Sequence, residues 1–193
     1  MKSKTSLLLA FLLVALVQLY VPASMILDRE KILASGTEYK FKTAPLDPND
    51  PFRGKYIVLS FRQNSIALPN RKPWENTEDI YVNLKTDRNG FAQVAGISKT
   101  EPAPNKAYLK AQIDYITTEH GKHQLFIRYP FDRFYLEETV APEAEKVYFD
   151  SVQDTTKTTY AVVQILKGEA VLKDVYIKDT PITEVVKAGR ASK

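Results

Sequence analysis

Hydrophobic residues form one long run near the start of the chain, and beyond it they alternate with polar residues. Thr5 to Leu27 is a stretch of 23 residues without a charge, and its centre, Leu7 to Val17, is wholly apolar. At a rise of about 1.5 Å per residue, such a helix is about 34 Å long, which is enough to cross about 30 Å of hydrocarbon. The pattern predicts a transmembrane helix within residues 1–35 and contact with membrane lipid through residues 5–27.

The charges that flank this run indicate its orientation. Lys2 and Lys4 precede it, whereas the sequence DREK at 28–31 follows it with no net charge. An excess of basic residues on the N-terminal side favours a cytoplasmic N-terminus. The rest of the chain is therefore expected on the extracytoplasmic side of the inner membrane.

Three interpretations of the run remain open. Its length favours an uncleaved signal anchor that crosses the membrane once. Small residues before Ser24 also allow a signal peptide that is cleaved after Ala23. The third interpretation is a buried helix of a cytosolic domain. If the helix is retained, Gly36 is expected to end it with a left-handed backbone.

After Gly36 the hydrophobic pattern has a period of two residues, which is typical of half-buried β-strands. Tyr39 and Phe41 alternate with lysines. Residues 55–62 carry apolar side chains on both faces, which predicts a central strand. Between these strands, residues 44–54 contain three prolines and are predicted to lack regular structure.

Turn signals join the later strands into three predicted hairpins. The first surrounds Asn89-Gly90, a pair that supplies the positive φ angles of a tight turn. The second turns within residues 118–123 and the third within 167–170. A single short helix is predicted over 141–152, because proline suits its first turn and glutamates there complement its dipole.

Together these elements predict a mainly β fold of the α+β class. A transmembrane helix precedes an antiparallel β-rich domain of hairpins with one short helix, over residues 36–182. The basic segment 183–193 is expected to be a flexible tail. No alternation of strands and helices occurs that would predict a nucleotide-binding doubly wound sheet.

The amino-acid composition excludes several classes of catalytic and metal-binding site. The 193 residues include no cysteine, which excludes disulfide scaffolds, thiol enzymes, zinc ribbons and iron–sulfur clusters. His120 and His123 are the only histidines, and two ligands across a turn do not make a metal site. The net charge of +4 comes from interleaved charges, which does not favour nucleic-acid binding. No cofactor or metal is expected.

The loop before the second strand is the first candidate interaction site. Its prolines display Asp47 and Asp50, and Arg53 can fold back onto these carboxylates. One interpretation is a rigid surface for a partner or a cation. The other is a self-contained loop whose aspartates cap its own turns. Gly54 permits a positive φ where the loop enters the strand.

The second candidate segment is 128–138, in which aromatic and charged residues are interleaved. Tyr135 is followed by two adjacent carboxylates, Glu137 and Glu138. Neighbours on a strand point to opposite faces, so these two carboxylates would not converge as a glycosidase pair must. The segment is interpreted as a strand with an aromatic core face and a charged outer face.

An envelope hydrolase is the enzymatic alternative. Besides the carboxylate pair, Ser24 with Lys55 downstream suggests a membrane-anchored Ser/Lys protease. A serine nucleophile needs its base within reach, and no second motif supports the pair. An enzyme is therefore not favoured.

The segment DPNDPFRGKYIVLSF at 47–61 resembles the signature of the GDYXXLXY protein family. Gly54, Tyr56 and Leu59 match the motif, whereas Lys55 replaces its aspartate and Phe61 replaces its final tyrosine. Residues 133–138 resemble the second block of the family, and the N-terminal apolar run is similar too. The resemblance covers most of residues 5–138.

The resemblance implies a bacterial membrane-anchored protein with no established activity, in a family often found as companions of multi-spanning membrane proteins. The loss of the aspartate at 55 favours Gly54, Tyr56 and Leu59 as determinants of the fold. The loss of a hydroxyl at Phe61 likewise indicates packing and not chemistry. We therefore expect a membrane-anchored extracytoplasmic binding or accessory domain with a membrane or envelope partner. The alternatives are the hydrolase and a purely structural domain.

Overall fold

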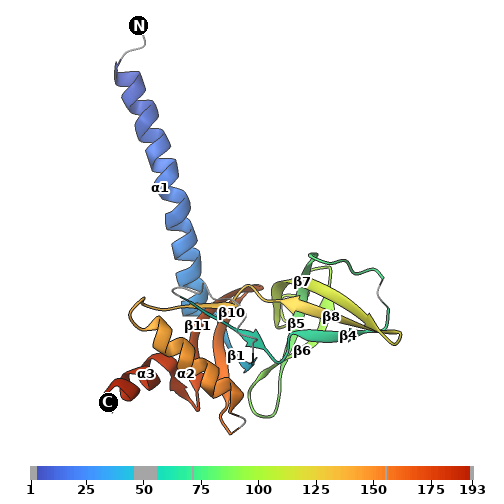
Figure 1. Ribbon diagram of the computed structural model, residues 1–193. Coiled ribbons are helices and arrows are strands. Elements are labelled where there is room, and N and C mark those ends of the chain that lie inside the picture. The colour runs from blue at the N-terminus through green and yellow to red at the C-terminus, as the bar shows by residue number, and fades with distance from the viewer. Residues whose placement is uncertain (1–3, 46–55, 71, 155, 192–193) are drawn as a thin grey trace.

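The computed structural model describes residues 4–45, 56–70, 72–154 and 156–191. A long helix, α1 (Lys4–Ser35), stands on a β-rich domain that contains two five-stranded antiparallel sheets (Figure 1). The predicted α+β class is confirmed, with an N-terminal apolar helix followed by antiparallel strands and short helices.

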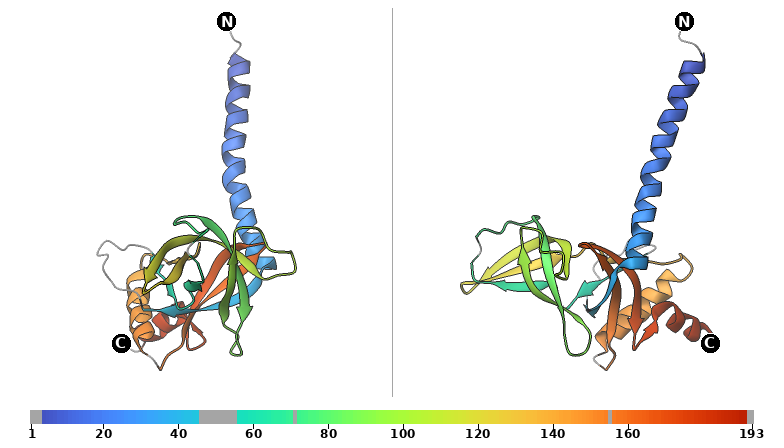
Figure 2. Two further views of the ribbon diagram at one scale, coloured as in Figure 1. Left: turned by 90° about the vertical axis from the view of Figure 1, so that its right-hand side faces the viewer. Right: turned by 180° about the vertical axis from the view of Figure 1, so that it is seen from behind.

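The apolar run of α1 packs against no other part of the described chain. Its large side chains are exposed from Leu7 to Leu27, and the helix is long and apolar enough to cross a membrane. In both further views the helix projects away from the domain and meets it only at its C-terminal end (Figure 2). Such an exposed apolar surface is unfavourable in water, which is compatible with a membrane span.

The end of α1 is fixed to the first sheet without a linker. Ile32 is buried, and the amide of Gly36 donates to the Ile32 carbonyl at 2.8 Å before β1 begins at Thr37. The prediction of a left-handed Gly36 is wrong, because its φ is not positive. Glycine is needed there for space, since a Cβ would lie 2.5 Å from the Ile32 carbonyl oxygen and 3.1 Å from the amide nitrogen of Ile165.

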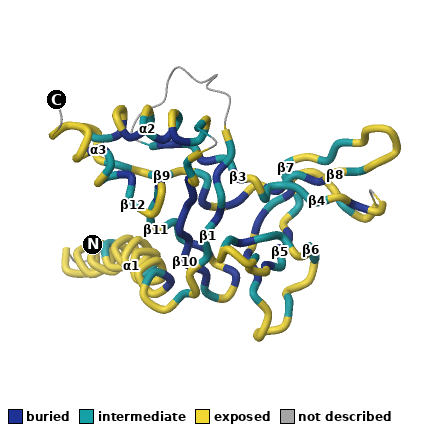
Figure 3. Tube along the Cα trace, turned by 90° about the horizontal axis from the view of Figure 1, so that it is seen from below, coloured by how far each residue is buried: buried dark blue, intermediate teal, exposed yellow. Residues whose placement is uncertain are grey.

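The first sheet carries the helix and holds the most buried strand. Its strand order is β12 (Thr180–Pro181), β11 (Glu169–Ile177), β10 (Thr159–Leu166), β1 (Thr37–Ala44) and β3 (Ser60–Phe61). Every residue of β10 up to Ile165 is buried. Figure 3 shows this burial through β10 and β1, in contrast to the exposed helix α1. Helices α2 (Ala141–Gln153) and α3 (Ile182–Ala191) pack together on one side of the sheet.

The second sheet lies beside the first, on the side away from α2 and α3 (Figure 1). Its order is β4 (Ser65–Leu68), β8 (Lys122–Arg128), β7 (Tyr108–Glu119), β5 (Asp79–Thr86) and β6 (Ala92–Ser98). The three predicted hairpins are present as β5–β6, β7–β8 and β10–β11. Gly90, Gly121 and Gly168 have positive φ in their respective turns.

The β10–β11 turn joins the two sheets. The amide of Lys110 on β7 donates to the Gly168 carbonyl at 2.8 Å, and its ammonium pairs with Glu169 at 2.7 Å. A Cβ at Gly168 would lie 2.6 Å from the ring of Tyr108. The turn therefore fits closely against the edge of β7.

The expected central strand over 55–62 is wrong in its described part. The chain changes sheets at Leu59, so that β2 (Tyr56–Val58) pairs with β9 (Arg133–Tyr135) and β3 pairs with β1. The amide of Leu59 donates to the Asp132 carbonyl at 2.8 Å, in register with the β2–β9 pairs, and the next two residues then pair with β1. Ile57, Leu59 and Phe61 are buried through this change of sheet, whereas Tyr56 and Val58 on the other face are half-buried.

The flexible tail expected over 183–193 is also wrong up to Ala191, because these residues belong to α3. Ile182 and Val186 are spaced four residues apart and are buried, which fixes one face of the helix on the core. Arg190 pairs with Glu143 of α2 at 2.7 Å. The domain therefore has two short helices where one was predicted.

Candidate functional site

Three described residues of the GDYXXLXY-like segment lie in the core, and one of them is Ile57, which is 1% exposed. Leu59 and Phe61 are 4% and 3% exposed. The ring of Phe61 meets the rings of Phe41, Tyr129 and Phe131 at centroid distances of 5.9, 5.5 and 5.3 Å. Aromatic edge contacts of this kind stabilise the junction between the sheets.

The hydroxyl of Tyr129 is satisfied inside this aromatic cluster. It donates to the carbonyl oxygen of Gln63, and burial raises the pKa of Tyr129 well above its usual value. The phenol therefore stays protonated and acts as a fixed donor. The cluster packs and orients the chain, and it offers no group for chemistry.

Tyr56 lies at the surface and forms an aromatic pair. It is opposite Tyr135 in the β2–β9 ribbon, with ring centroids 5.5 Å apart. The guanidinium of Arg133 lies 5.2 Å from the centroid of the Tyr56 ring. Tyr135 is 65% exposed, so one side of this aromatic pair is open to the surroundings.

This ribbon borders a cavity of about 480 Å³ at the base of α1. We call it the basal cavity. It is lined by Arg29, Pro130, Phe131, Asp132, Arg133, Tyr135, Ala170, Val171 and Leu172. Three charged side chains therefore face it, two of them cationic, and the residues from β11 supply an apolar wall.

The two arginines of the basal cavity differ in their pairing. The Nε atom of Arg133 lies 4.0 Å from a carboxylate oxygen of Asp132. Within the part of the chain that the structure describes, no carboxylate lies within ion-pair distance of Arg29. The cavity is thus lined by Arg133 on β9, which Asp132 partly neutralises. It is also lined by Arg29 on α1, which has no carboxylate partner in the described chain.

The other predicted site residues are not brought to this cavity. Asp47, Asp50, Arg53 and Gly54 lie outside the described residues, so their interaction role stays a prediction. Glu137 and Glu138 are exposed and follow β9 rather than lying on a strand, which corrects the expectation that a strand separates them. The carbonyl of Glu137 accepts the amides of Val140 and Ala141 and so starts α2.

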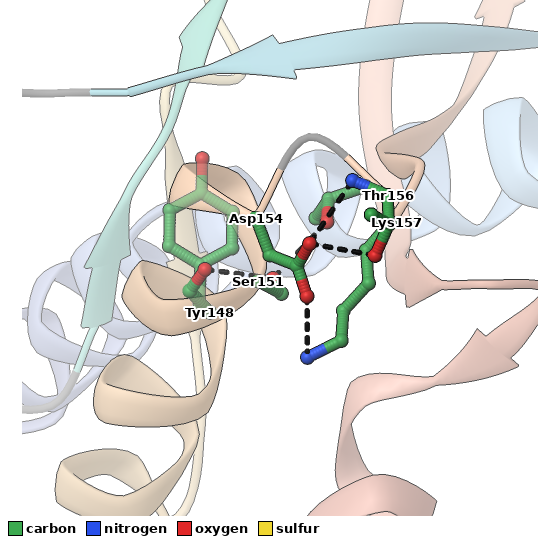
Figure 4. A network of polar contacts seen from close by, with 6 residues as sticks. Tyr148, Ser151, Asp154, Thr156 and Lys157 are labelled. Atoms are coloured by element: carbon green, nitrogen blue, oxygen red, sulfur yellow. Dashed lines mark hydrogen bonds and ion pairs between the residues drawn. The ribbon is translucent and has the colours of Figure 1, made fainter.

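A polar network at the end of α2 has a structural role (Figure 4). Asp154 accepts the amide and hydroxyl of Thr156 at 3.0 and 2.6 Å and pairs with Lys157 at 3.2 Å. These hydrogen bonds lower the pKa of Asp154 to about 2. The arrangement closes the turn between α2 and β10.

The buried hydroxyl of Ser151 belongs to the same region. It donates to the carbonyl of Tyr148 at 2.7 Å and accepts the hydroxyl of Thr159 at 3.0 Å. Burial raises the pKa of Tyr148 to about 12, so this phenol is neutral too. A serine that donates to its own helix has no base to activate it.

A small polar pocket of about 100 Å³ lies nearby and is lined by three cations. Each of these cations already has an interaction. The ammonium of Lys42 lies 4.3 Å from the centroid of the Phe91 ring, Arg62 donates to the Thr43 carbonyl at 3.3 Å, and Lys157 pairs with Asp154. The basal cavity is therefore the stronger candidate site.

The described residues do not form the catalytic geometry that the hydrolase alternative requires. The hydroxyl of Ser24 donates to the Val21 carbonyl at 2.8 Å, within α1. Its proposed partner, Lys55, lies outside the described residues. Glu137 and Glu138 are exposed at the surface and do not line the basal cavity.

Sequence reasoning missed Arg29 as a site residue, because the DREK segment was considered for its net charge beside the apolar run. The available signal was its position two residues after the apolar run. Once α1 continues as a helix to Ser35, Arg29 stands beside the domain and not in an open loop.

Comparison with known proteins gives one family. The model described as "GDYXXLXY protein" matches residues 18–175, which is most of the chain. No curated protein and no solved structure gives a significant match.

Proposed function

The chain belongs to the GDYXXLXY protein family, and from this premise we propose that it is a single-pass inner-membrane protein that holds an accessory domain at the extracytoplasmic surface. Its N-terminus lies in the cytoplasm, and the β-rich domain binds a partner in the membrane or envelope. A multi-spanning membrane protein is the partner that suits this position.

The observation that carries the proposal is the junction of α1 with the first sheet. The apolar run is exposed along its length, yet the helix end is packed into the domain at Ile32. Only Gly36 separates α1 from β1. Because no flexible linker separates the domain from the helix, the surface of the domain beside α1 lies next to the bilayer.

Binding is favoured over catalysis by the distribution of reactive groups. Within the described ranges no cluster of three or more histidine or acidic residues could hold a metal. The hydroxyls of Ser24 and Ser151 donate to carbonyls of their own helices. By contrast, the exposed ring of Tyr135 and the open cation of Arg29 are groups that recognise a surface.

A topology experiment tests the anchoring. The full chain with a C-terminal tag is expected to stay in the membrane after alkaline carbonate washing, and external protease is expected to remove the tag in spheroplasts. Val14→Lys places a charge at the centre of the run, which costs about 2.5–3.5 kcal/mol of insertion free energy, and should reduce the membrane fraction. Release of the wild type by carbonate, or a protected tag, would refute the proposal.

The mass of the mature N-terminus separates the anchor from the signal peptide. An intact N-terminus is expected for the anchor. A chain that begins at Ser24 would instead show cleavage after Ala23 and would leave no transmembrane segment.

A crosslinking experiment tests the partner. A photoreactive residue at Tyr135 is expected to capture a membrane protein in intact cells. The same residue at Lys187 is the control, because it lies on α3, which is below the base of α1 in Figures 1 and 2. Equal capture of abundant bystanders from both positions would favour a purely structural domain.

A further inference from the structure

We propose that the basal cavity binds the phosphate group of an anionic phospholipid. This inference rests on the proposed function, because it requires α1 to cross the bilayer. It adds a specific ligand class to the candidate site and commits the cavity to lipid.

The level of the cavity relative to the membrane is the first argument. The apolar run ends at Leu27, and Arg29 follows two residues later. Two residues of α-helix advance about 3 Å along the axis, so Arg29 stands where hydrocarbon gives way to headgroups. Since Arg29 lines the cavity, the cavity opens at the depth of the lipid phosphates.

The charges that face the cavity are the second argument. Arg29 and Arg133 stand on different elements, α1 and β9, and only Asp132 opposes them among the lining residues. Asp132 is 4.0 Å from Arg133, which leaves Arg29 without a carboxylate in the described chain. A phosphate between two guanidinium groups would satisfy both with charge-assisted hydrogen bonds.

The remaining lining favours a lipid over a free anion. Tyr135 is 65% exposed, and tyrosine is enriched at the interface between membrane and water. Ala170, Val171 and Leu172 of β11 give one wall an apolar character. A site for inorganic phosphate needs no such wall, whereas a phospholipid presents a phosphate directly above apolar chains.

Lipid retention by the full-length protein tests the inference. The protein is placed in nanodiscs of phosphatidylcholine mixed with phosphatidylglycerol, released into detergent, and weighed by native mass spectrometry. The wild type is expected to retain phosphatidylglycerol in preference to phosphatidylcholine. Arg29→Gln and Arg133→Gln are each expected to weaken that retention roughly five- to tenfold, from the loss of one cation near the surface.

Two further variants keep the result interpretable. Arg190→Gln removes the same charge from α3, where Arg190 pairs with Glu143, and should retain lipid like the wild type. Arg29→Lys keeps the charge but loses the two-pronged geometry of guanidinium, so its retention should fall between wild type and Arg29→Gln. Because Arg29 is exposed, its substitutions should leave the domain folded, which circular dichroism checks.

The outcomes are distinguishable. If the protein enters nanodiscs but retains both lipids equally, or if Arg29→Gln and Arg133→Gln retain phosphatidylglycerol like the wild type, the lipid site is refuted and the anchoring stands. If inorganic phosphate at millimolar concentration displaces the lipid, the site is one for free anions and the inference is wrong. If the protein fails to enter nanodiscs, the proposed function and this inference both fail.

Discussion

Two glycines that look alike in the sequence have opposite surroundings, and this difference predicts their tolerance of alanine. A Cβ at Gly36 would lie 2.5 Å from the Ile32 carbonyl oxygen, whereas at Gly96 nothing lies within 4 Å. Backbone atoms cannot rotate away from a new methyl group. Gly36→Ala is therefore expected to lower the free energy of unfolding by about 1–3 kcal/mol.

Gly96→Ala is the matched control and should change the free energy of unfolding by no more than about 0.5 kcal/mol. Denaturant unfolding of the full chain in detergent measures both variants. Equal destabilisation by the two substitutions would contradict the close fit of α1 against β10.

Asp154 predicts a pH dependence of stability. Its hydrogen bonds with Thr156 and its ion pair with Lys157 lower the pKa from 3.8 to about 2 in the folded protein. A lowered folded-state pKa stabilises the fold fully above the unfolded value, and this stabilisation is lost as pH falls from 3.8 towards 2. Asp154→Asn should therefore lower Tm at pH 6 and have a much smaller effect at pH 2.

Thermal melts of the wild type and the variant across this pH range measure the difference in Tm. Glu145→Gln, on α2 outside this turn, is a comparison with the same loss of charge. A difference in Tm that stays constant from pH 6 to pH 2 would show that the Asp154 carboxylate does not titrate as described.

At the scale of elements, α3 predicts that the end of the chain is structurally required. Ile182 and Val186 are 0% and 3% exposed, and burying each aliphatic side chain contributes about 1.5–3 kcal/mol. A chain that ends at Pro181 is expected to lose at least about 3 kcal/mol of unfolding free energy. A chain that ends at Ala191 keeps the whole helix and should unfold like the wild type.

The hairpins were predictable from sequence because their determinants are local. Gly90 in one turn and Lys167-Gly168 in another provide positive φ angles within a few residues of the strands that they join, although the positive φ expected at Asn89 is wrong. The break at Leu59 was not predictable in this way. It depends on pairing first with β9 and then with β1, two strands that are distant in sequence from each other.

Helix α3 was missed for a different reason. The basic and small residues near the C-terminus concealed a short apolar face at Ile182, Val185 and Val186. That face makes a helix stable only when a core is present to receive it, because isolated helices of this length are marginal in water. The pattern alone therefore could not separate a helix from a tail.

The same limit applies to the candidate site. Tyr135 was identified because aromatic and charged residues are concentrated around it, and Leu59 and Phe61 were correctly expected to pack. Arg29 could be assigned to the site only from the structure, in which residues of α1, β9 and β11 together line the basal cavity. Contacts between segments so distant in sequence are determined by topology and not by a local pattern.

At the scale of the whole molecule, the absence of a linker predicts how the domain sits on the bilayer. The chain has no cysteine, so a single Tyr135→Cys can carry a fluorophore without background labelling. Quenchers attached to lipid headgroups are expected to reduce its emission in vesicles. The same label at Lys187→Cys should be quenched much less.

Insertion of about ten Gly and Ser residues between Ser35 and Gly36 should abolish the quenching at position 135. A flexible chain of this length spans roughly 17 Å on average, which is enough to release the domain from the surface. The inserted variant should remain in the membrane fraction, and its Tm should fall because the insertion separates Gly36 from Ile32. Unchanged quenching after the insertion would show that the domain adheres to lipid by itself.

The β10–β11 hairpin contacts both the end of α1 and the second sheet. At one end of β10, Gly36 fits against Ile165, and at the tip of the same hairpin Gly168 and Glu169 bind Lys110 of the second sheet. A rotation or tilt of α1 would therefore be transmitted to the second sheet partly through this hairpin. A neighbour that tilts α1 within the bilayer would thus also change the orientation of the second sheet.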